Sequence, residues 1–259
     1  MALTLLLDVG GTRLKWAWCQ GPALMATGGA AWWDAADHLA DEQQEMEAKA
    51  GGPLQHIQRL SRAWPPAAGH LTEADLSERL GVAVDVMDIP QELPFSVGYT
   101  SGAPGTDRLA AAMACHHRDP GGSFVIVDAG TCVTVDLLSP GAWRGGAILP
   151  GLRLQSEAMA RAGLPVMQAD ADGKWPWRPE PEGALGTSTS SALEAGIPRA
   201  LRLAVERTAQ DLKQVDPCAQ VILTGGDAAH FDGLGGWQTF ADPYLVLTGA
   251  ALLSNDFTE

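Results

Sequence analysis

Three short glycine-containing segments of this chain combine residue types that suit phosphate chemistry. They are Asp8-Val-Gly-Gly-Thr12 and Asp128-Ala-Gly-Thr131, each after an apolar run, and Leu223-Thr-Gly-Gly226 late in the chain. Glycines let the backbone approach phosphate oxygens closely, and threonine hydroxyls and amides donate to them. The aspartates can hold cations, which neutralise a phosphoryl group during transfer. One such turn is an ordinary strand end, but the three together favour a nucleotide phosphate site.

A fourth segment, Gly105-Thr-Asp107-Arg108, places a carboxylate that can act as a base next to an arginine guanidinium. Asp107 can accept a proton from a substrate hydroxyl. An ordinary Asp is a weak base at neutral pH, but phosphoryl transfer through a loose transition state asks mainly for positioning. Arg108 can bind a carboxylate in a bidentate manner. The residues alone leave a second interpretation open, in which Asp107 is only the N-cap of the Ala-rich helix that follows.

The first two glycine segments occupy equivalent places in a repeated pattern. Residues 3–7 form an apolar run that ends in an aspartate, and residues 14–19 resume as a second strand after the turn. Residues 124–127 and 133–138 repeat this arrangement. Short apolar runs bounded by turns are typical of buried strands, and self-similarity at this long separation indicates two related α/β halves.

The remaining elements follow from periodicity, caps and breakers. The sequence predicts helices at 32–50, 72–80, from Asp107 to about His116, at 152–162 and at 191–215, the last broken near Pro198. Strands are predicted at 82–89, 219–223 and 245–247, turns at 145–146 and 148–151, a terminal helix from Thr248, and an excursion or lid at 168–183. The domain boundary is expected after the Ala-rich helix, giving domains at 1–117 and 118–259.

Composition excludes several classes of protein. The 259 residues suffice for one large domain or two smaller ones that share a cleft. A net charge of −14 with only 17 Lys and Arg residues argues against nucleic-acid binding, so Trp32-Trp33 and Trp175-Pro-Trp177 are interpreted as packing or interface residues. No apolar run reaches the length of a membrane span, and the N-terminal run is interpreted as a strand. The four scattered cysteines indicate reduced thiols in a cytoplasmic protein.

The order of these motifs resembles that of type III pantothenate kinases, and the related Bvg accessory factor proteins share the pattern. The resemblance runs from end to end and is densest from Tyr99 to Gly196. The residues that carry it are Asp8-Val-Gly-Gly-Thr-Arg-Leu-Lys15, Tyr99, Gly105-Thr-Asp-Arg108, Asp128-Ala-Gly-Thr131, Gly145-Gly-Ala-Ile-Leu-Pro-Gly151, Thr189 and Thr224-Gly-Gly226.

The resemblance implies a fold, an activity and partners. The fold would be α/β, of the acetate and sugar kinase, Hsc70 and actin type, with two ribonuclease-H-like (actin-like ATPase) domains and ATP in the cleft between them. The enzyme would be a cytoplasmic type III pantothenate kinase, which phosphorylates the primary hydroxyl of pantothenate to give 4′-phosphopantothenate in the first step of coenzyme A biosynthesis. It would need ATP, Mg²⁺ and a monovalent cation, K⁺ or NH₄⁺, and would form a homodimer without nucleic-acid or membrane partners.

The resemblance also implies roles for individual residues. ATP would be bound by Asp8, Val9, Gly10, Gly11, Thr12, Arg13, Leu14, Lys15 and Thr131. Pantothenate would be bound by Tyr99, Gly105, Thr106, Asp107, Arg108 and Thr189. Asp107 would be the catalytic proton acceptor, and Asp128 would help to hold the monovalent cation. The small side chains of the Ala-rich helix after Asp107 would suit a dimer interface.

Three departures and two alternatives accompany this interpretation. The family usually has Asn where Gly11 stands and Leu or Val where Pro104 stands, and residues 53–66 poorly resemble the family's strand in this region. One alternative is a ROK-type sugar kinase, whose first loop is close to Asp8-Val-Gly-Gly-Thr12, but the Glu-x-Gly-His segment and cysteine-rich zinc site of that family are missing from the sequence. The other is a non-catalytic regulatory or accessory protein on the same fold.

Overall fold

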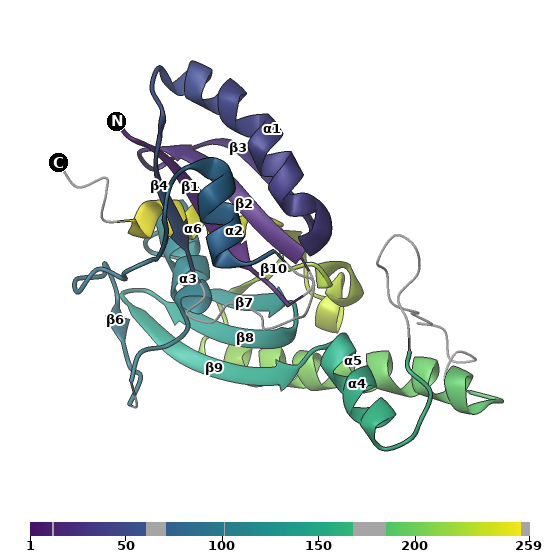
Figure 1. Cartoon of the computed structure of the whole chain (residues 1–259). Helices are drawn as coiled ribbons and strands as arrows, with labels where there is room; N and C mark the ends of the chain where they lie inside the picture. The colour runs from purple at the N-terminus through teal and green to yellow at the C-terminus, as the bar shows by residue number, and fades with distance from the viewer. Residues whose placement is uncertain (12, 61–70, 101, 168–184, 255–259) are drawn as a thin grey trace. The chain divides into compact units, whose positions relative to one another are not determined.

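A computed structural model describes residues 1–11, 13–60, 71–100, 102–167 and 185–254 of the chain. Thr12 and the excursion expected at 168–183, which includes Trp175 and Trp177, lie outside the described residues. The chain divides into two compact units (Figure 1). Unit 1 comprises Met1–Pro120 together with the C-terminal segment that begins at Tyr244, and unit 2 comprises Gly121–Pro243. No helix in the described part of the chain is long and apolar enough to cross a membrane.

Unit 1 is a five-stranded sheet with helices on both faces (Figure 1). The strands lie in the order β3-β2-β1-β4-β5. Helices α1 and α2 pack on one face through a core that includes Leu5, Trp18, Leu39 and Leu76, and α6 contacts the strands from the other face. The bounds of its elements are β1 Leu3–Val9, β2 Arg13–Gln20, β3 Ala23–Ala31, α1 Trp32–Ala50, β4 Leu54–Arg59, α2 Glu73–Leu80, β5 Val84–Val86, β6 Ser96–Val97, α3 Thr106–Arg118 and α6 Leu245–Leu253.

Unit 2 contains a second sheet in which five strands lie in the order β9-β8-β7-β10-β11. The long helix α5 contacts β7, β8 and β9, and a core that includes Val125, Val135, Val205 and Val221 fills the space beneath it. The bounds of its elements are β7 Phe124–Ala129, β8 Cys132–Ser139, β9 Ala142–Pro150, α4 Leu152–Arg161, α5 Thr189–Val215, β10 Gln220–Thr224, η2 Ala228–Phe231, η3 Leu234–Gly236 and β11 Thr239–Ala241.

The two sheets have the same topology. In each unit the first strand pairs antiparallel with the second and parallel with the fourth. The second strand also pairs antiparallel with the third, and the fourth pairs parallel with the fifth. This shared order confirms the two related α/β halves that the repeated strand and aspartate pattern predicts.

Local signals explain where several helices begin and end. The hydroxyl of Thr72 accepts a hydrogen bond from the amide of Asp75, whose carboxylate accepts from the amide of Thr72, so a capping box starts α2 as predicted. Helices α1 and α2 end at Gly51 and Gly81, which adopt left-handed φ angles of 72° and 73°. Helix α5 continues through Pro198 and is not broken there.

Other expected elements differ from the structure. The turns predicted at 145–146 and 148–151 are wrong, because strand β9 runs from Ala142 to Pro150. The strand predicted at 245–247 is also wrong, since these residues begin helix α6. A short apolar run fits a buried strand and a buried helix equally well, and seven of the nine residues of α6 are buried. The C-terminal helix α6 belongs to unit 1, whereas the sequence predicts a single domain at residues 118–259.

The Ala-rich helix α3 packs closely against α6 within unit 1. Ala110, Ala111 and Ala112 are buried. Gly249 of α6 lies so close to α3 that an added Cβ would stand 1.6 Å from the carbonyl oxygen of Ala110. The small side chains of α3 thus permit close packing inside the unit, which is a different role from the dimer contact expected for them.

Candidate active site

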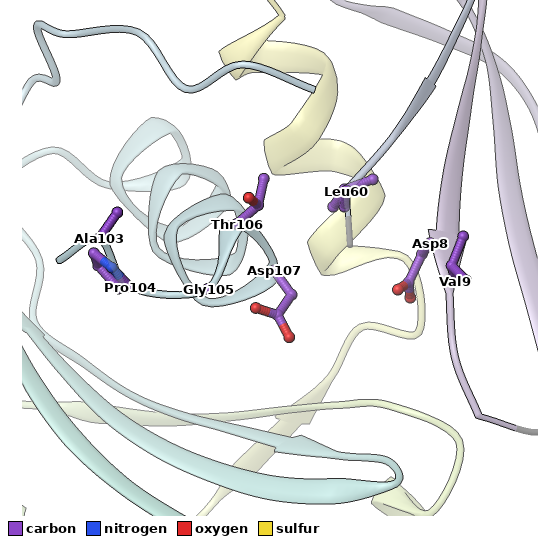
Figure 2. Close-up of a pocket in the computed structure, with 8 residues that line it drawn as sticks. All are labelled: Asp8, Val9, Leu60, Ala103, Pro104, Gly105, Thr106 and Asp107. Carbon is purple, nitrogen blue, oxygen red and sulfur yellow. The ribbon is translucent and has the colours of Figure 1, made fainter. Parts of the chain in front are cut away.

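Unit 1 contains a pocket of about 290 Å³ at the end of β1 and the beginning of α3. Figure 2 shows the carboxylates of Asp8 and Asp107 facing the same open space from these two elements. The pocket brings together two acidic residues that the sequence singled out separately. Its lining residues are Asp8, Val9, Leu60, Ala103, Pro104, Gly105, Thr106 and Asp107.

Asp8 lies near the carboxyl end of β1, directly opposite Lys15 of β2 in the antiparallel ladder. The carboxylate is half-buried, and burial is the main reason why its pKa is raised above the usual value. The negative charge of Asp107 raises the pKa of Asp8 further, whereas the ammonium group of Lys15 lowers it. A cation that entered the pocket would counter these effects and favour the ionised form of Asp8.

Asp107 is exposed and lies in the first turn of α3. The N-cap of this helix is Gly105, so the interpretation of Asp107 as the N-cap is wrong. The backbone amide of Arg108 donates a hydrogen bond to Oδ1 of Asp107 at 2.9 Å, which holds the carboxylate at the helix start. A negative charge at this position is also favoured by the helix dipole.

In the segment expected to form the first phosphate loop, Asp8 and Val9 end strand β1, and Arg13, Leu14 and Lys15 begin strand β2. The amide of Gly10 donates to the carbonyl oxygen of Arg13 at 3.1 Å and closes the turn. The guanidinium of Arg13 donates to the carbonyl of Gly29 at 3.1 Å. The side chain of Leu14 is fully buried in the core. Of the residues predicted to bind ATP in this segment, Asp8 and Val9 line the pocket.

The residues predicted to bind pantothenate are only partly brought together. Gly105, Thr106 and Asp107 line the pocket with Asp8, but Tyr99 and Arg108 do not. Tyr99 is 41% exposed, whereas Arg108 is buried at 7%. Thr189 belongs to unit 2, where it is the exposed first residue of α5.

Unit 2 brings its own glycine turns together at one end of its sheet. Asp128 of β7 lies beside Thr224 of β10 in the parallel ladder. The next residue, Gly225, has a φ of 93°, and an added Cβ would lie 2.2 Å from the carbonyl oxygen of Ala129. The amide of Asp227 donates to the same oxygen at 2.9 Å. Only glycine fits at position 225, because the two turns touch through their backbones.

A third turn joins this cluster at the junction of β9 and α4. The amide of Gly151 donates to the carbonyl oxygen of Thr131 at 3.0 Å. A Cβ on Gly151 would lie 2.3 Å from the carbonyl oxygen of Gly130. The exposed Thr131 and the half-buried Asp128 therefore sit on a backbone that glycine contacts fix from both sides.

Sequence reasoning missed several residues of these sites. Leu60 directly follows β4 and lines the unit 1 pocket because β4 pairs with β1, and the local sequence carries no signal for this pairing. Ala103 and Pro104 line the pocket as neighbours of the Gly105 motif. The sequence marks Gly151 as the end of a turn at 148–151 and as part of the Gly145–Gly151 motif, but it does not predict the contact of Gly151 with Thr131.

The carboxylates present suit a magnesium ion that is held mainly by a nucleotide. Among the described residues, no group of three or more His, Cys, Asp or Glu side chains could hold a metal ion without other ligands. Mg²⁺ commonly binds one or two carboxylates and takes its other ligands from phosphates and water. Asp8, in a pocket that also holds Asp107, is a fitting carboxylate for that arrangement.

Comparisons with solved structures define the class of fold. EutJ, an ethanolamine utilization protein from Carboxydothermus hydrogenoformans, aligns with a TM-score of 0.52 at 16% identity over 98% of this chain and 90% of its own. Component A of (R)-2-hydroxyglutaryl-CoA dehydratase from Acidaminococcus fermentans aligns with a TM-score of 0.50 at 16% identity over 98% and 96%. With the duplicated strand order, these likenesses define two ribonuclease-H-like domains of the actin-like ATPase fold.

Sequence comparisons define the family. The profile described as type III pantothenate kinase matches residues 4–211. A type III pantothenate kinase of Phocaeicola vulgatus is 34% identical over 169 residues, 64% of this chain and 67% of that protein. Another, of Alkalilimnicola ehrlichii, is 30% identical over 258 residues, 97% of this chain and 98% of that protein. The chain belongs to the type III pantothenate kinase family and is a kinase. The sugar-kinase and non-catalytic alternatives are not favoured.

Proposed function

We propose that this kinase transfers the γ-phosphoryl group of ATP to the primary hydroxyl of pantothenate, giving 4′-phosphopantothenate for coenzyme A biosynthesis. Family membership supports the substrate, and one structural observation supports the chemistry. A carboxylate at the start of α3, Asp107, faces the same pocket as the carboxylate of Asp8 at the end of the first glycine-turn strand. One group can thus take a proton from the acceptor while the other serves the cation that accompanies ATP.

In the proposed mechanism Asp107 is the catalytic residue. The amide of Arg108 donates a hydrogen bond to Oδ1 of Asp107. Oδ2 of Asp107 accepts the proton of the pantothenate hydroxyl as the hydroxyl oxygen bonds to the γ-phosphorus. The bond from phosphorus to the β,γ-bridging oxygen breaks, and the leaving group is ADP. Gly105 and Thr106 place the acceptor, because they line the pocket beside Asp107. A weak base is sufficient since charge stabilisation and alignment dominate this reaction.

We also propose how the nucleotide and its cations are held. The backbone of residues 8–15 and the turn at Thr131 would contact the ATP phosphates, because tight glycine turns present amides to anions. Asp8 would be the carboxylate nearest Mg²⁺, which when bound neutralises charge on the transferring group. Asp128 would help to bind a monovalent cation, K⁺ or NH₄⁺. The position of Asp128 at the strand end where two glycine turns meet supports this role, because cations of this kind take oxygen ligands from carboxylates and backbone carbonyls.

The remaining proposals concern partners and location. Tyr99, Arg108 and Thr189 are proposed to contact pantothenate, in keeping with their positions in the family's motifs. The active form is proposed to be a cytoplasmic homodimer. Light scattering at micromolar concentration tests the assembly, and a monomeric mass would reject it.

The direct test of the function is product analysis after incubation with ATP, Mg²⁺ and pantothenate. We expect 4′-phosphopantothenate and ADP in equal amounts, with a faster rate when K⁺ or NH₄⁺ is added than with neither. Mannose and glucose serve as control acceptors. Phosphorylation of a sugar in place of pantothenate, or ATP hydrolysis without a phosphorylated acceptor, would contradict the proposal.

A further inference from the structure

The starts of two helices hold the glycine turns of the two units in related ways. In unit 2 the amide of Gly151, the N-cap of α4, donates to the carbonyl oxygen of Thr131 at 3.0 Å. In unit 1 the indole Nε1 of Trp32, the first residue of α1, donates to the carbonyl oxygen of Gly10 at 3.1 Å. Helices α1 and α4 each follow the third strand of equivalent sheets. In each unit the residue at or next to a helix start thus donates to a carbonyl oxygen of the first glycine turn, through a side chain in unit 1 and through the backbone in unit 2.

Trp32 is held firmly enough to direct this hydrogen bond. Its side chain is 1% exposed and packs in the same core cluster as Leu14 and Leu39. A buried indole has few rotamers and usually finds a partner for its N–H group. The packing confirms that Trp32 is a core residue, but packing alone does not require the indole N–H to face the first glycine turn.

The hydrogen bond from Trp32 constrains the turn at a sensitive point. The amide of Gly10 already donates to the carbonyl of Arg13 at 3.1 Å, so both polar groups of Gly10 have fixed partners. A peptide group is planar and trans. Fixing the carbonyl oxygen of Gly10 therefore fixes the direction of the Gly11 amide, which points away from Trp32. Amides of such turns are the groups that bind phosphate oxygens.

We propose that Trp32 is a positioning residue for the first phosphate turn, acting through the Gly10 carbonyl to hold this turn in the conformation that receives the ATP phosphates. This inference rests on the proposed function as an ATP-dependent kinase. A residue with this role affects nucleotide binding, whereas a residue that only fills the core affects stability alone.

The test compares two tryptophans of the same core. Trp18 is fully buried on β2, and its Nε1 donates to Oε2 of Glu42 at 2.7 Å, so Trp18→Phe removes an indole hydrogen bond that lies away from the turn. Loss of one neutral hydrogen bond predicts that Trp32→Phe raises both the Kd for Mg·ATP and the KM for ATP about three- to tenfold. We expect an unchanged KM for pantothenate. Trp18→Phe should lower the melting temperature but change the Kd for Mg·ATP by less than about twofold.

Calorimetric titration with Mg·ATP keeps this inference separate from the identity of the acceptor. A wild type that binds Mg·ATP but does not phosphorylate pantothenate contradicts the proposed function, and the Kd comparison of the two variants still stands. Equal Kd values for Trp32→Phe and the wild type, or equal losses of affinity in both variants, would overturn the role of Trp32. If Trp32→Phe does not fold, Trp32→Met takes its place, because Met fills irregular gaps and also lacks the N–H donor.

Discussion

The negative charge of Asp107 adds to the burial that raises the pKa of Asp8, although the two residues lie far apart in the sequence. Their carboxylates face one pocket from the end of β1 and the first turn of α3. Burial raises the pKa of Asp8 still more, and the nearby Lys15 only partly opposes it. In the free protein the ionised form of Asp8 is therefore unfavourable. A proton or a bound cation relieves this electrostatic strain.

This strain predicts an unusual dependence of stability on pH. A carboxyl group whose pKa is raised in the folded state binds more protons there than in the unfolded chain. The contribution of Asp8 to the free energy of unfolding is therefore fully present below pH 3.8 and is lost as the pH rises through the folded pKa. We expect Asp8→Asn to be more stable than the wild type at pH 7, with the difference closing as the pH falls toward 3.8. Thermal unfolding from pH 3.5 to 7.5 measures this.

Asp216 provides a comparison of opposite sign. Hydrogen bonds from the hydroxyls of Ser123 and Ser139 hold its pKa below the usual value. Its contribution to stability is present above pH 3.8 and is lost as pH falls through the folded pKa. Asp216→Asn should therefore be less stable than the wild type at pH 7. If both variants shift stability in the same direction, the assignment of strain to Asp8 is wrong.

The backbone contact between the two turns of unit 2 predicts different outcomes for adjacent glycines. Ala at position 225 would meet the carbonyl of Ala129 and would require a φ of 93°, so Gly225→Ala should cost about 1–3 kcal/mol of unfolding free energy. We expect weaker binding of ATP as well, because Ala129 belongs to the turn that carries Thr131. A Cβ on Gly226 meets nothing within 4 Å, and Gly226→Ala should change stability by less than about 0.5 kcal/mol. Similar denaturation curves for the two variants would argue against the contact.

The packing of α6 on α3 predicts that Gly249 supports the position of Asp107. An added Cβ would stand 1.6 Å from the carbonyl oxygen of Ala110, so Gly249→Ala should destabilise the protein by about 1–3 kcal/mol and lower kcat by displacing α3. Gly196→Ala, at a helical site with nothing within 4 Å, should stabilise it by about 0.5–1 kcal/mol. Denaturant titration and initial rates measure both effects. A stabilising Gly249→Ala would contradict this account of the contact.

The sequence predicted the elements that carry strong local signals. The apolar runs that end in Asp8 and Asp128 predicted both central hairpins and the duplication. Strand β3 was missed because Ala23–Ala31 is rich in Ala and Gly, which have low strand propensity. Its place is set by pairing with β2, a tertiary contact that local sequence does not record.

In the candidate site too, local sequence signals predicted some residues, and tertiary contacts that the local sequence does not record placed the others. Residue types at Asp8 and Gly105–Asp107 predicted the acidic and glycine-containing parts of the pocket. Leu60 could not be predicted, because it reaches the pocket through the parallel pairing of β4 with β1. Trp32 was expected to pack, and its side chain is buried, but the direction of its indole N–H depends on the three-dimensional position of the turn.

The rate of pantothenate phosphorylation by Asp107→Asn tests the central claim most directly. Asp107 is exposed, so the substitution should leave the fold intact, while loss of the proton acceptor should lower kcat about 10²- to 10⁴-fold. Asp85→Asn, at another exposed aspartate of unit 1, is the matched control and should retain the wild-type rate. A folded Asp107→Asn variant that phosphorylates pantothenate as fast as Asp85→Asn would contradict the assignment of Asp107 as the catalytic residue.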